Sequence, residues 1–308
     1  MPLEVISRRR AIAQALTVGV LAGASTPGWA TTEPLPTLLR GDEDALRALD
    51  AAQRLTVEVE INDQGPFPFM IDTGANSSAI SRDLAMRLGL SIQGKVMLHG
   101  IAGQVLVDQV GAASVRTRRR LVRDMKLALV DDPAMKGRGL LGQDWLGDAN
   151  ILIDYGHRRM VVGGALPIPT GATVAAPMRL KRSGLALVDG SIPGRYLLAF
   201  LDSGSNATIG NLALLEAARA TGNLIGDPID IKLLSVTGQT LPGALYVLAR
   251  VQLGGVWLRR LPVVMGQIHT FGYWGLNDQP ALLIGADVLQ KFASVAMDYR
   301  RGEVRFTL

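Results

Sequence analysis

The amino-acid sequence predicts an all-β protein made of two related lobes, and three features of the 308-residue chain lead to this prediction. Short runs rich in Val, Leu and Ile alternate with Gly- and Pro-containing turns, a pattern typical of strands. A long segment of the first half of the chain recurs in the second half. The tripeptide Asp-(Thr/Ser)-Gly occurs once in each copy, directly after an apolar run.

Residues 1–30 have the features of an export signal. Arg8–Arg10 precede a mildly apolar stretch, Ala11–Ala24, which is too short to span a bilayer, and small residues follow near Ala30. The arginines favour the bacterial twin-arginine route to the periplasm or the medium, and we expect no stable membrane insertion once the signal is removed. A general secretory signal or an uncleaved anchor is the alternative interpretation. Residues 31–53 would form an arm, a linker or a prosegment.

The internal repeat defines the rest of the domain organisation. Leu55–Asp72 aligns without a gap on Leu185–Asp202, and both segments are predicted to form a strand, a polar turn and a second strand. The two copies occupy residues 54–165 and 178–308, and the Pro-containing segment 166–177 is predicted to connect them. Brief helices are expected at residues 82–88 and 212–220.

Asp72 and Asp202 are the candidates for the chemistry. Each lies on a tight turn just past an apolar strand, which keeps its carboxylate away from bulk water. Two such carboxylates brought together cannot both ionise without strong repulsion. A single Asp-Ser-Gly is more often an ordinary turn, because Asp caps its own backbone and Gly accepts positive φ. The repeated pair instead indicates an acid/base site made of two carboxylates.

These residues resemble the aspartic peptidases of the pepsin and retropepsin superfamily. The resemblance rests on an apolar strand leading into Asp72-Thr-Gly or Asp202-Ser-Gly, a small-residue flap, and a later apolar-apolar-Gly element, and it covers about residues 54–308. It implies two retropepsin- or pepsin-like β-barrel lobes with a cleft between them. The chain departs from the family pattern at Ser203, where threonine is commoner, and in the flaps, which carry no alignable tyrosine.

The resemblance also implies a role for each matching residue. Asp72 and Asp202 would be the catalytic pair. Thr73 and Ser203 would hydrogen-bond across the lobe junction, and Ser205 would be able to donate to a carboxylate. The residues implied to support the pair are Thr73, Gly74, Ser203, Gly204 and Ser205. The flap residues implied to bind substrate are Gly100, Ile101, Ala102 and Gly103 in the first copy and Val236, Thr237 and Gly238 in the second. Gly142 and Gly285 would allow close backbone approach beneath the pair.

The function expected from this resemblance is an exported bacterial aspartic endopeptidase that cleaves peptides or proteins without a metal or other cofactor. Both aspartates lie in one chain, so a monomer is expected. The alternative from another functional class is an exported peptide-binding or structural module that keeps the cleft but has lost turnover. Substrate preference and any removal of a prosegment stay open.

Several other patterns receive ordinary explanations. Residues 1–30 carry three arginines and one glutamate, so their removal lowers the net charge from +5 to +3, too little to indicate nucleic-acid binding. The basic run 116–120 is predicted to be a solvated hairpin turn. Gly137–Gly142 fits a dinucleotide-binding pattern but has no preceding strand. His99, His157 and His269 are scattered without metal-ligand spacing and are predicted to be surface or satisfied core residues.

Overall fold

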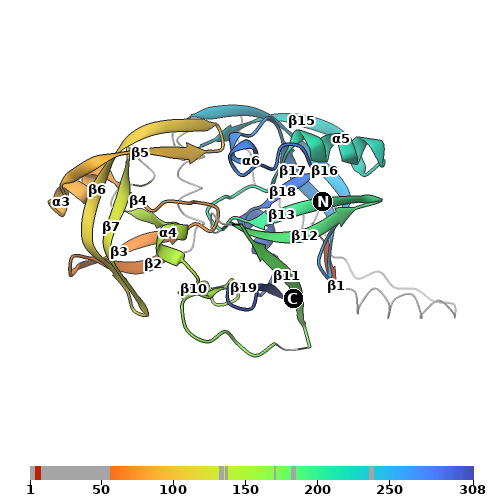
Figure 1. The fold of residues 1–308 in the computed structure, drawn as a ribbon. Coiled ribbons are helices and arrows are strands. Elements are labelled where there is room, and N and C mark those ends of the chain that lie inside the picture. Colours follow the sequence, from red (N-terminus) through yellow and green to blue (C-terminus); the bar gives the residue numbers. More distant parts are fainter. Residues whose placement is uncertain are drawn as a thin grey trace, which may run out of the picture.

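The computed structural model describes residues 4–7, 56–131, 135, 138–169, 171–181, 185–235 and 239–308. Strands dominate these residues, and two β-rich bodies lie side by side (Figure 1). The expected brief helices are present as α3 (Arg82–Arg87) and α5 (Leu212–Ala220). The predicted all-β class is therefore confirmed.

The N-terminal lobe is a ring of six strands with a seventh attached. Its strands are β2 (Thr56–Ile61), β3 (Gln64–Ile71), β4 (Ala79–Ser81), β5 (Ile92–Gly100), β6 (Gly103–Thr117), β7 (Arg120–Val130) and β8 (Gly139–Leu141). They pair in the order β2-β3-β8-β4-β7-β6-β5, and a further pairing of β2 with β6 closes the ring. The strand β5 lies outside this closed ring and forms a long hairpin with β6.

The C-terminal lobe repeats this arrangement strand for strand. Its strands are β12 (Ala186–Ile192), β13 (Arg195–Leu201), β14 (Ile209–Gly210), β15 (Leu224–Leu234), β16 (Thr240–Leu253), β17 (Val256–Met265) and β18 (Ala281–Ile284). They pair in the order β12-β13-β18-β14-β17-β16-β15, and β12 also pairs with β16. The repeat in the sequence thus corresponds to two lobes of the same strand connectivity.

A bridging sheet combines strands from both halves of the chain. It consists of β9 (Ile151–Asp154), β10 (Arg159–Val162), β11 (Thr173–Leu180), β19 (Ser294–Asp298) and β20 (Glu303–Thr307), paired in the order β10-β9-β19-β20-β11. One buried apolar cluster runs through this sheet and both lobes, with Phe69, Val251 and Phe306 among its members. Burial of this shared apolar surface stabilises the association of the two lobes.

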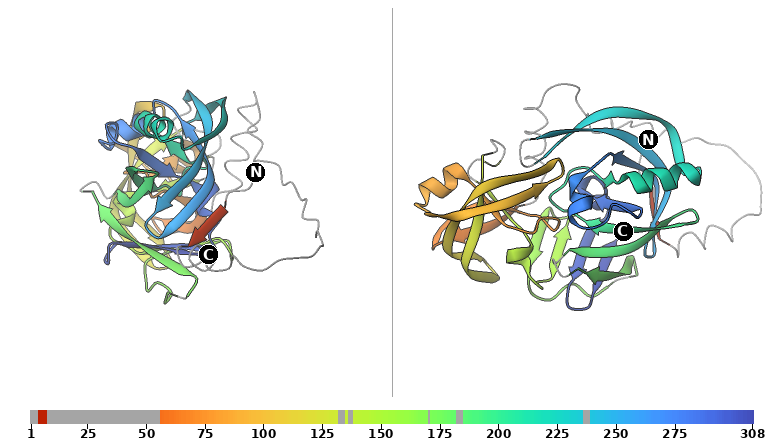
Figure 2. Two further views of the ribbon diagram at one scale, coloured as in Figure 1. Left: turned by 90° about the vertical axis from the view of Figure 1, so that its right-hand side faces the viewer. Right: turned by 45° about the horizontal axis from the view of Figure 1, so that its top comes forward.

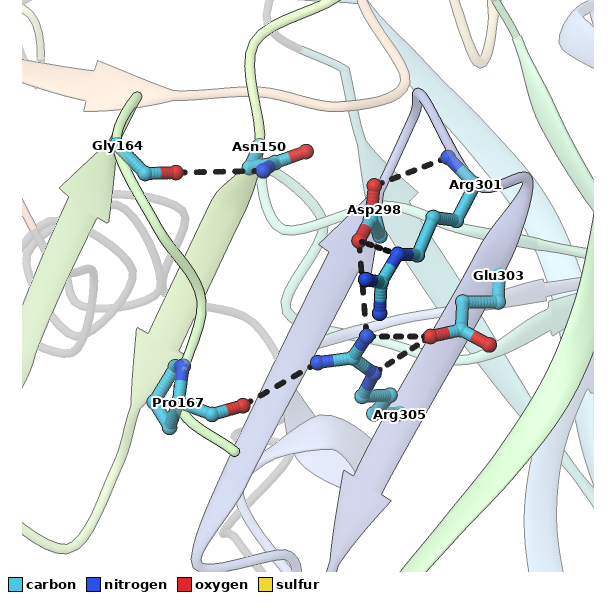
Figure 3. Close-up of polar contacts among 7 residues, drawn as sticks. All are labelled: Asn150, Gly164, Pro167, Asp298, Arg301, Glu303 and Arg305. Atoms are coloured by element: carbon cyan, nitrogen blue, oxygen red, sulfur yellow. Dashed lines mark hydrogen bonds and ion pairs between the residues drawn. The ribbon is translucent and has the colours of Figure 1, made fainter. Parts of the chain in front are cut away.

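The predicted linker 166–177 is partly strand. Residues 173–177 pair with 303–307 of β20, so β11 begins five residues before the predicted boundary. Arg305, which is only 5% exposed, anchors the part of the linker that precedes β11, because its side chain donates to the Pro167 carbonyl at 3.2 Å. The same guanidinium donates to Glu303 at 2.7 Å and lies 3.6 Å from Asp298 (Figure 3). The connection between the lobes is therefore tied to the sheet beneath them.

The strand β1 (Glu4–Ser7) lies within the segment predicted to be an export signal. Its backbone pairs antiparallel with Val256–Arg259 of β17. The left view of Figure 2 draws β1 in red. Cleavage of the signal would remove this added strand and leave the ring of the C-terminal lobe complete. Arg8–Arg10 and residues 31–53 lie outside the described residues. Within the part of the chain that the structure describes, no helix is long and apolar enough to cross a membrane.

Candidate functional site

The two Asp-(Thr/Ser)-Gly loops leave equivalent strands in the two lobes. Asp72 follows β3, which pairs parallel with β8, and the Asp72 amide donates to the Leu141 carbonyl at 3.0 Å. Asp202 follows β13, which pairs parallel with β18, and its amide donates to Ile284 at 2.9 Å. Buried, rigid strands thus fix the starting point of each loop.

Backbone amides orient both carboxylates in the same way. The amides of Gly74 and Ala75 each donate to Asp72 Oδ1 at 2.9 Å. The amides of Gly204 and Ser205 donate to Asp202 Oδ1 at 2.9 and 3.0 Å. Two donors on one oxygen fix the plane of each carboxyl group.

Each carboxylate lies against the glycine of the opposite loop. A methyl group added at Gly74 would lie 2.6 Å from Asp202 Oδ2, and one added at Gly204 would lie 2.8 Å from Asp72 Oδ1. Any side chain larger than hydrogen at either glycine would therefore collide with a carboxylate. The fold brings Asp72 and Asp202, 130 residues apart in the sequence, to one junction between the lobes.

Thr73 and Ser203 join the two loops by reciprocal hydrogen bonds. Thr73 Oγ1 donates to the Leu201 carbonyl at 2.6 Å and accepts from the Ser203 amide at 3.1 Å. Ser203 Oγ donates to the Ile71 carbonyl at 2.7 Å and accepts from the Thr73 amide at 3.3 Å. Since Thr73 is only 1% exposed, loss of either hydroxyl would leave buried backbone groups unpaired.

The hydroxyl of Ser205 does not reach a carboxylate. It donates to the Ala207 carbonyl at 2.9 Å, and only the backbone amide of Ser205 contacts Asp202. A serine hydroxyl readily bonds to a nearby carbonyl within its own turn, which explains the difference from the role that the resemblance implies. Ala75 and Ser205 occupy equivalent positions in the two lobes. Although their side chains differ, the backbone amide of each donates to the aspartate of its own loop.

Gly142 and Gly285 lie directly beneath the two loops. A methyl group would approach the Ala75 carbonyl to 2.8 Å at Gly142 and the Ala207 carbonyl to 2.5 Å at Gly285. Short helices α4 (Gln143–Leu146) and α7 (Ala286–Leu289) begin immediately after these glycines. The first amide of each helix donates to the loop above it, Gln143 to Ala75 at 2.8 Å and Ala286 to Ser205 at 2.7 Å.

The sequence interpretation missed a second pair of acidic residues, which supports these loops from below. Asp144 Oδ1 accepts from the hydroxyl of Ser78 at 2.6 Å and from its amide at 2.9 Å. Asp287 accepts from the hydroxyl and the amide of Thr208 at 2.8 and 3.1 Å. Ser78 and Thr208 are 130 residues apart, the same separation as Asp72 and Asp202. The internal repeat could therefore have pointed to their partners, Asp144 and Asp287.

The first flap reaches the opposite lobe. Gly100 and Gly103 face each other across the tip of the β5–β6 hairpin, with Ile101 and Ala102 in the turn. The Ile101 carbonyl accepts from the His269 amide at 2.9 Å. Of the second flap, Val236, Thr237 and Gly238 lie outside the described residues, although the neighbouring residues 234 and 240 pair as the base of a β15–β16 hairpin.

The basic run 116–120 forms the turn between β6 and β7, as the sequence predicts. A cavity of about 320 Å³ lies beside this turn, and none of its lining residues belongs to the site described above. Its lining residues are Arg119, Arg120, Asp148, Ala149, Asn150, Gly163, Gly164 and Arg300. Among the described residues, no group of three or more His, Cys, Asp or Glu residues could hold a metal ion.

One family model matches part of the N-terminal lobe. Residues 57–148 match the family model of a gag-polyprotein putative aspartyl protease. The match extends from β2 to just past α4 and includes Asp72, Gly142 and the first flap. No curated protein matches the chain.

Burial raises the pKa of Asp287 to about 6, and we predict a corresponding pH dependence of stability. An unfolded Asp titrates near pH 4, so the folded state binds the proton more tightly. The contribution of protonated Asp287 to the stability of the folded state is therefore complete below about pH 4. It is lost as the pH rises through 6, which lowers the free energy of unfolding by about 3 kcal/mol. We expect a carboxyl carbon resonance of Asp287 to titrate near pH 6 in NMR spectra.

The free energy of unfolding should show the same effect. Between pH 4 and 7, the free energy of unfolding of the wild-type protein should fall by about 3 kcal/mol relative to that of Asp287→Asn. Asp148→Asn is the matched control, because the Asp148 side chain is 74% exposed. A titration midpoint of Asp287 near pH 4 would contradict the prediction.

Proposed function

We propose that the chain is an aspartic endopeptidase that hydrolyses peptide bonds with a water molecule activated by Asp72 and Asp202. The observation that carries the proposal is that each carboxylate packs on the glycine of the opposite loop. The match of residues 57–148 to an aspartyl protease family model supports the same class of activity. A peptide or protein is the proposed substrate.

The proposed mechanism follows from two carboxyl groups at one junction. In aspartic proteases two carboxyl groups held in one site share a single proton, and we propose the same chemistry for this pair. The ionised partner accepts a proton from the bound water, and the protonated partner donates to the oxygen of the scissile carbonyl. The backbone amides on Oδ1 orient both carboxyl groups, and Asp202 Oδ2 lies beside Gly74 of the opposite loop.

The Thr73–Ser203 hydrogen bonds would keep the two carboxylates in register during turnover. They bond each hydroxyl to the strand that carries the opposite aspartate, through Leu201 and Ile71. Positioning of reacting groups to well under 1 Å is a large part of catalytic rate enhancement. The proposed mechanism uses no metal and no organic cofactor, and since one chain supplies both aspartates we propose that the enzyme is a monomer.

Substitution of either aspartate tests the proposal. Asp72→Asn and Asp202→Asn should each lower kcat on a denatured protein substrate by about 10²–10⁴-fold, because an amide cannot transfer the proton. The double variant should be little worse than either single one, since the two groups act as a unit. Cleavage should also be sensitive to pepstatin.

Asp148→Asn serves again as the control and should retain full activity, and circular dichroism should confirm that all variants fold. Near-normal turnover in either active-site variant would overturn the assignment of the pair. A folded wild-type protein that binds pepstatin or peptides but cleaves none would instead indicate a binding module that has lost turnover.

We also propose that the protein is exported to the periplasm or the medium by the twin-arginine route. The receptor of that route reads arginine specifically, whereas general secretion needs only positive charge. Replacement of Arg8, Arg9 and Arg10 by lysine should therefore leave unprocessed precursor in the cytoplasm, measured by fractionation and mass. Normal processing of the triple-lysine variant would reassign the segment to the general secretory route.

A further inference from the structure

Two histidines from opposite lobes meet beside the first flap. His99 lies in β5, one residue before the turn that begins at Gly100, and His269 begins α6 (His269–Tyr273) of the C-terminal lobe. His99 Nδ1 lies 3.0 Å from His269 Nε2. Tyr273 completes the cluster, with its ring centroid 4.0 Å from that of His99. The spacing of the two histidines in the sequence gives no sign of this contact, because they are 170 residues apart.

Backbone and apolar contacts hold the flap tip at the same place. The His269 amide donates to the Ile101 carbonyl at 2.9 Å. The Ile101 side chain packs against a buried apolar cluster that belongs entirely to the C-terminal lobe and includes Phe271 and Leu276. The hairpin from the N-terminal lobe therefore ends on α6, which Figure 1 shows next to the end of β5.

The hydrogen bond between the imidazoles depends on their protonation. A neutral imidazole offers one donor and one acceptor, whereas a protonated imidazole offers two donors and no acceptor. The bond between His99 and His269 therefore requires at least one neutral ring. When both rings are protonated, the bond is lost and two like charges repel each other.

Within the described residues, neutral and basic groups lie beside the two imidazoles. Gln104 faces His99 across the β5–β6 hairpin, and Tyr273 stacks on it from α6. Lys181 donates to the Trp274 carbonyl just past the end of α6 and adds a positive charge near this helix. Within the described part of the chain, no carboxylate bonds to either imidazole. Burial first, and the charge of His269 second, lower the pKa of His99.

We propose that the His99–His269 contact is an acid-released latch, which holds the first flap on the C-terminal lobe at neutral pH and frees it in mild acid. The closed state disfavours protonation of His99, so by linkage it is fully stable above the ordinary pKa of histidine, about 6.5, and is lost as the pH falls below it. This consequence rests on the proposed function: release would let a peptide substrate reach Asp72 and Asp202 in mild acid.

The latch can be tested by a distance that needs no turnover, so its failure is separate from failure of the proposed enzyme activity. The chain has no cysteine, so dyes can be placed at Leu106→Cys in the flap hairpin and Leu212→Cys at the start of α5, two exposed positions. Single-molecule energy transfer then reports the ratio of open to closed flap. Between pH 8 and pH 5 we expect this ratio to rise roughly fivefold or more, about the effect of one net side-chain hydrogen bond.

Histidine variants determine whether these two rings cause the change. His99→Phe keeps a ring on Tyr273 but removes the titration, and His269→Gln removes it from the other side. Both variants should abolish the pH response, whereas His157→Gln, at an exposed histidine in the β9–β10 turn, should keep it. A wild-type ratio that does not change between pH 8 and 5, or a response that persists in His99→Phe or His269→Gln, would overturn the latch.

Discussion

The structure depends on the reciprocal hydrogen bonds between Thr73 and Ser203, which connect two lobes of equal connectivity at their loops. Each hydroxyl donates to a carbonyl of the opposite strand and accepts from the opposite amide, so neither loop satisfies its buried groups alone. An isolated lobe would expose these groups and the apolar surface of the shared core. The geometry at Asp72 and Asp202 is thus a property of the assembled pair of lobes.

The support beneath the loops is duplicated in the same way. In both lobes a glycine permits close backbone approach, and an aspartate two residues later binds the hydroxyl and the amide of a residue on the loop above. Burial raises the pKa of both Asp144 and Asp287, and it raises that of Asp287 to about 6. The two lobes therefore repeat both the hydrogen bonds of this support and the direction in which burial shifts the pKa of its aspartate.

Much of this arrangement could be predicted from the sequence, because the repeat preserves residue types at fixed separations. The repeat predicts equivalent positions for the two aspartates, for the glycines that touch them and for those beneath them, and the sequence also predicts the brief helices α3 and α5. It could not identify contacts that have no counterpart in the other copy. His99 and His269 are 170 residues apart and occupy unlike elements, so only the three-dimensional approach of the flap to α6 brings them together. The start of β11 was also missed, because its Pro- and Thr-containing sequence forms a strand only by pairing with β20.

The proposed function requires that one polypeptide supplies both halves of the active site. The most direct measurement is peptidase activity per molecule over a wide range of dilution, with the mass in solution determined by sedimentation at the same concentrations. If Asp72 and Asp202 of one chain act together, activity per molecule stays constant and sedimentation shows a single species near the monomer mass. A fall in activity per molecule on dilution, accompanied by a shift of mass from dimer to monomer, would contradict the intrachain pair.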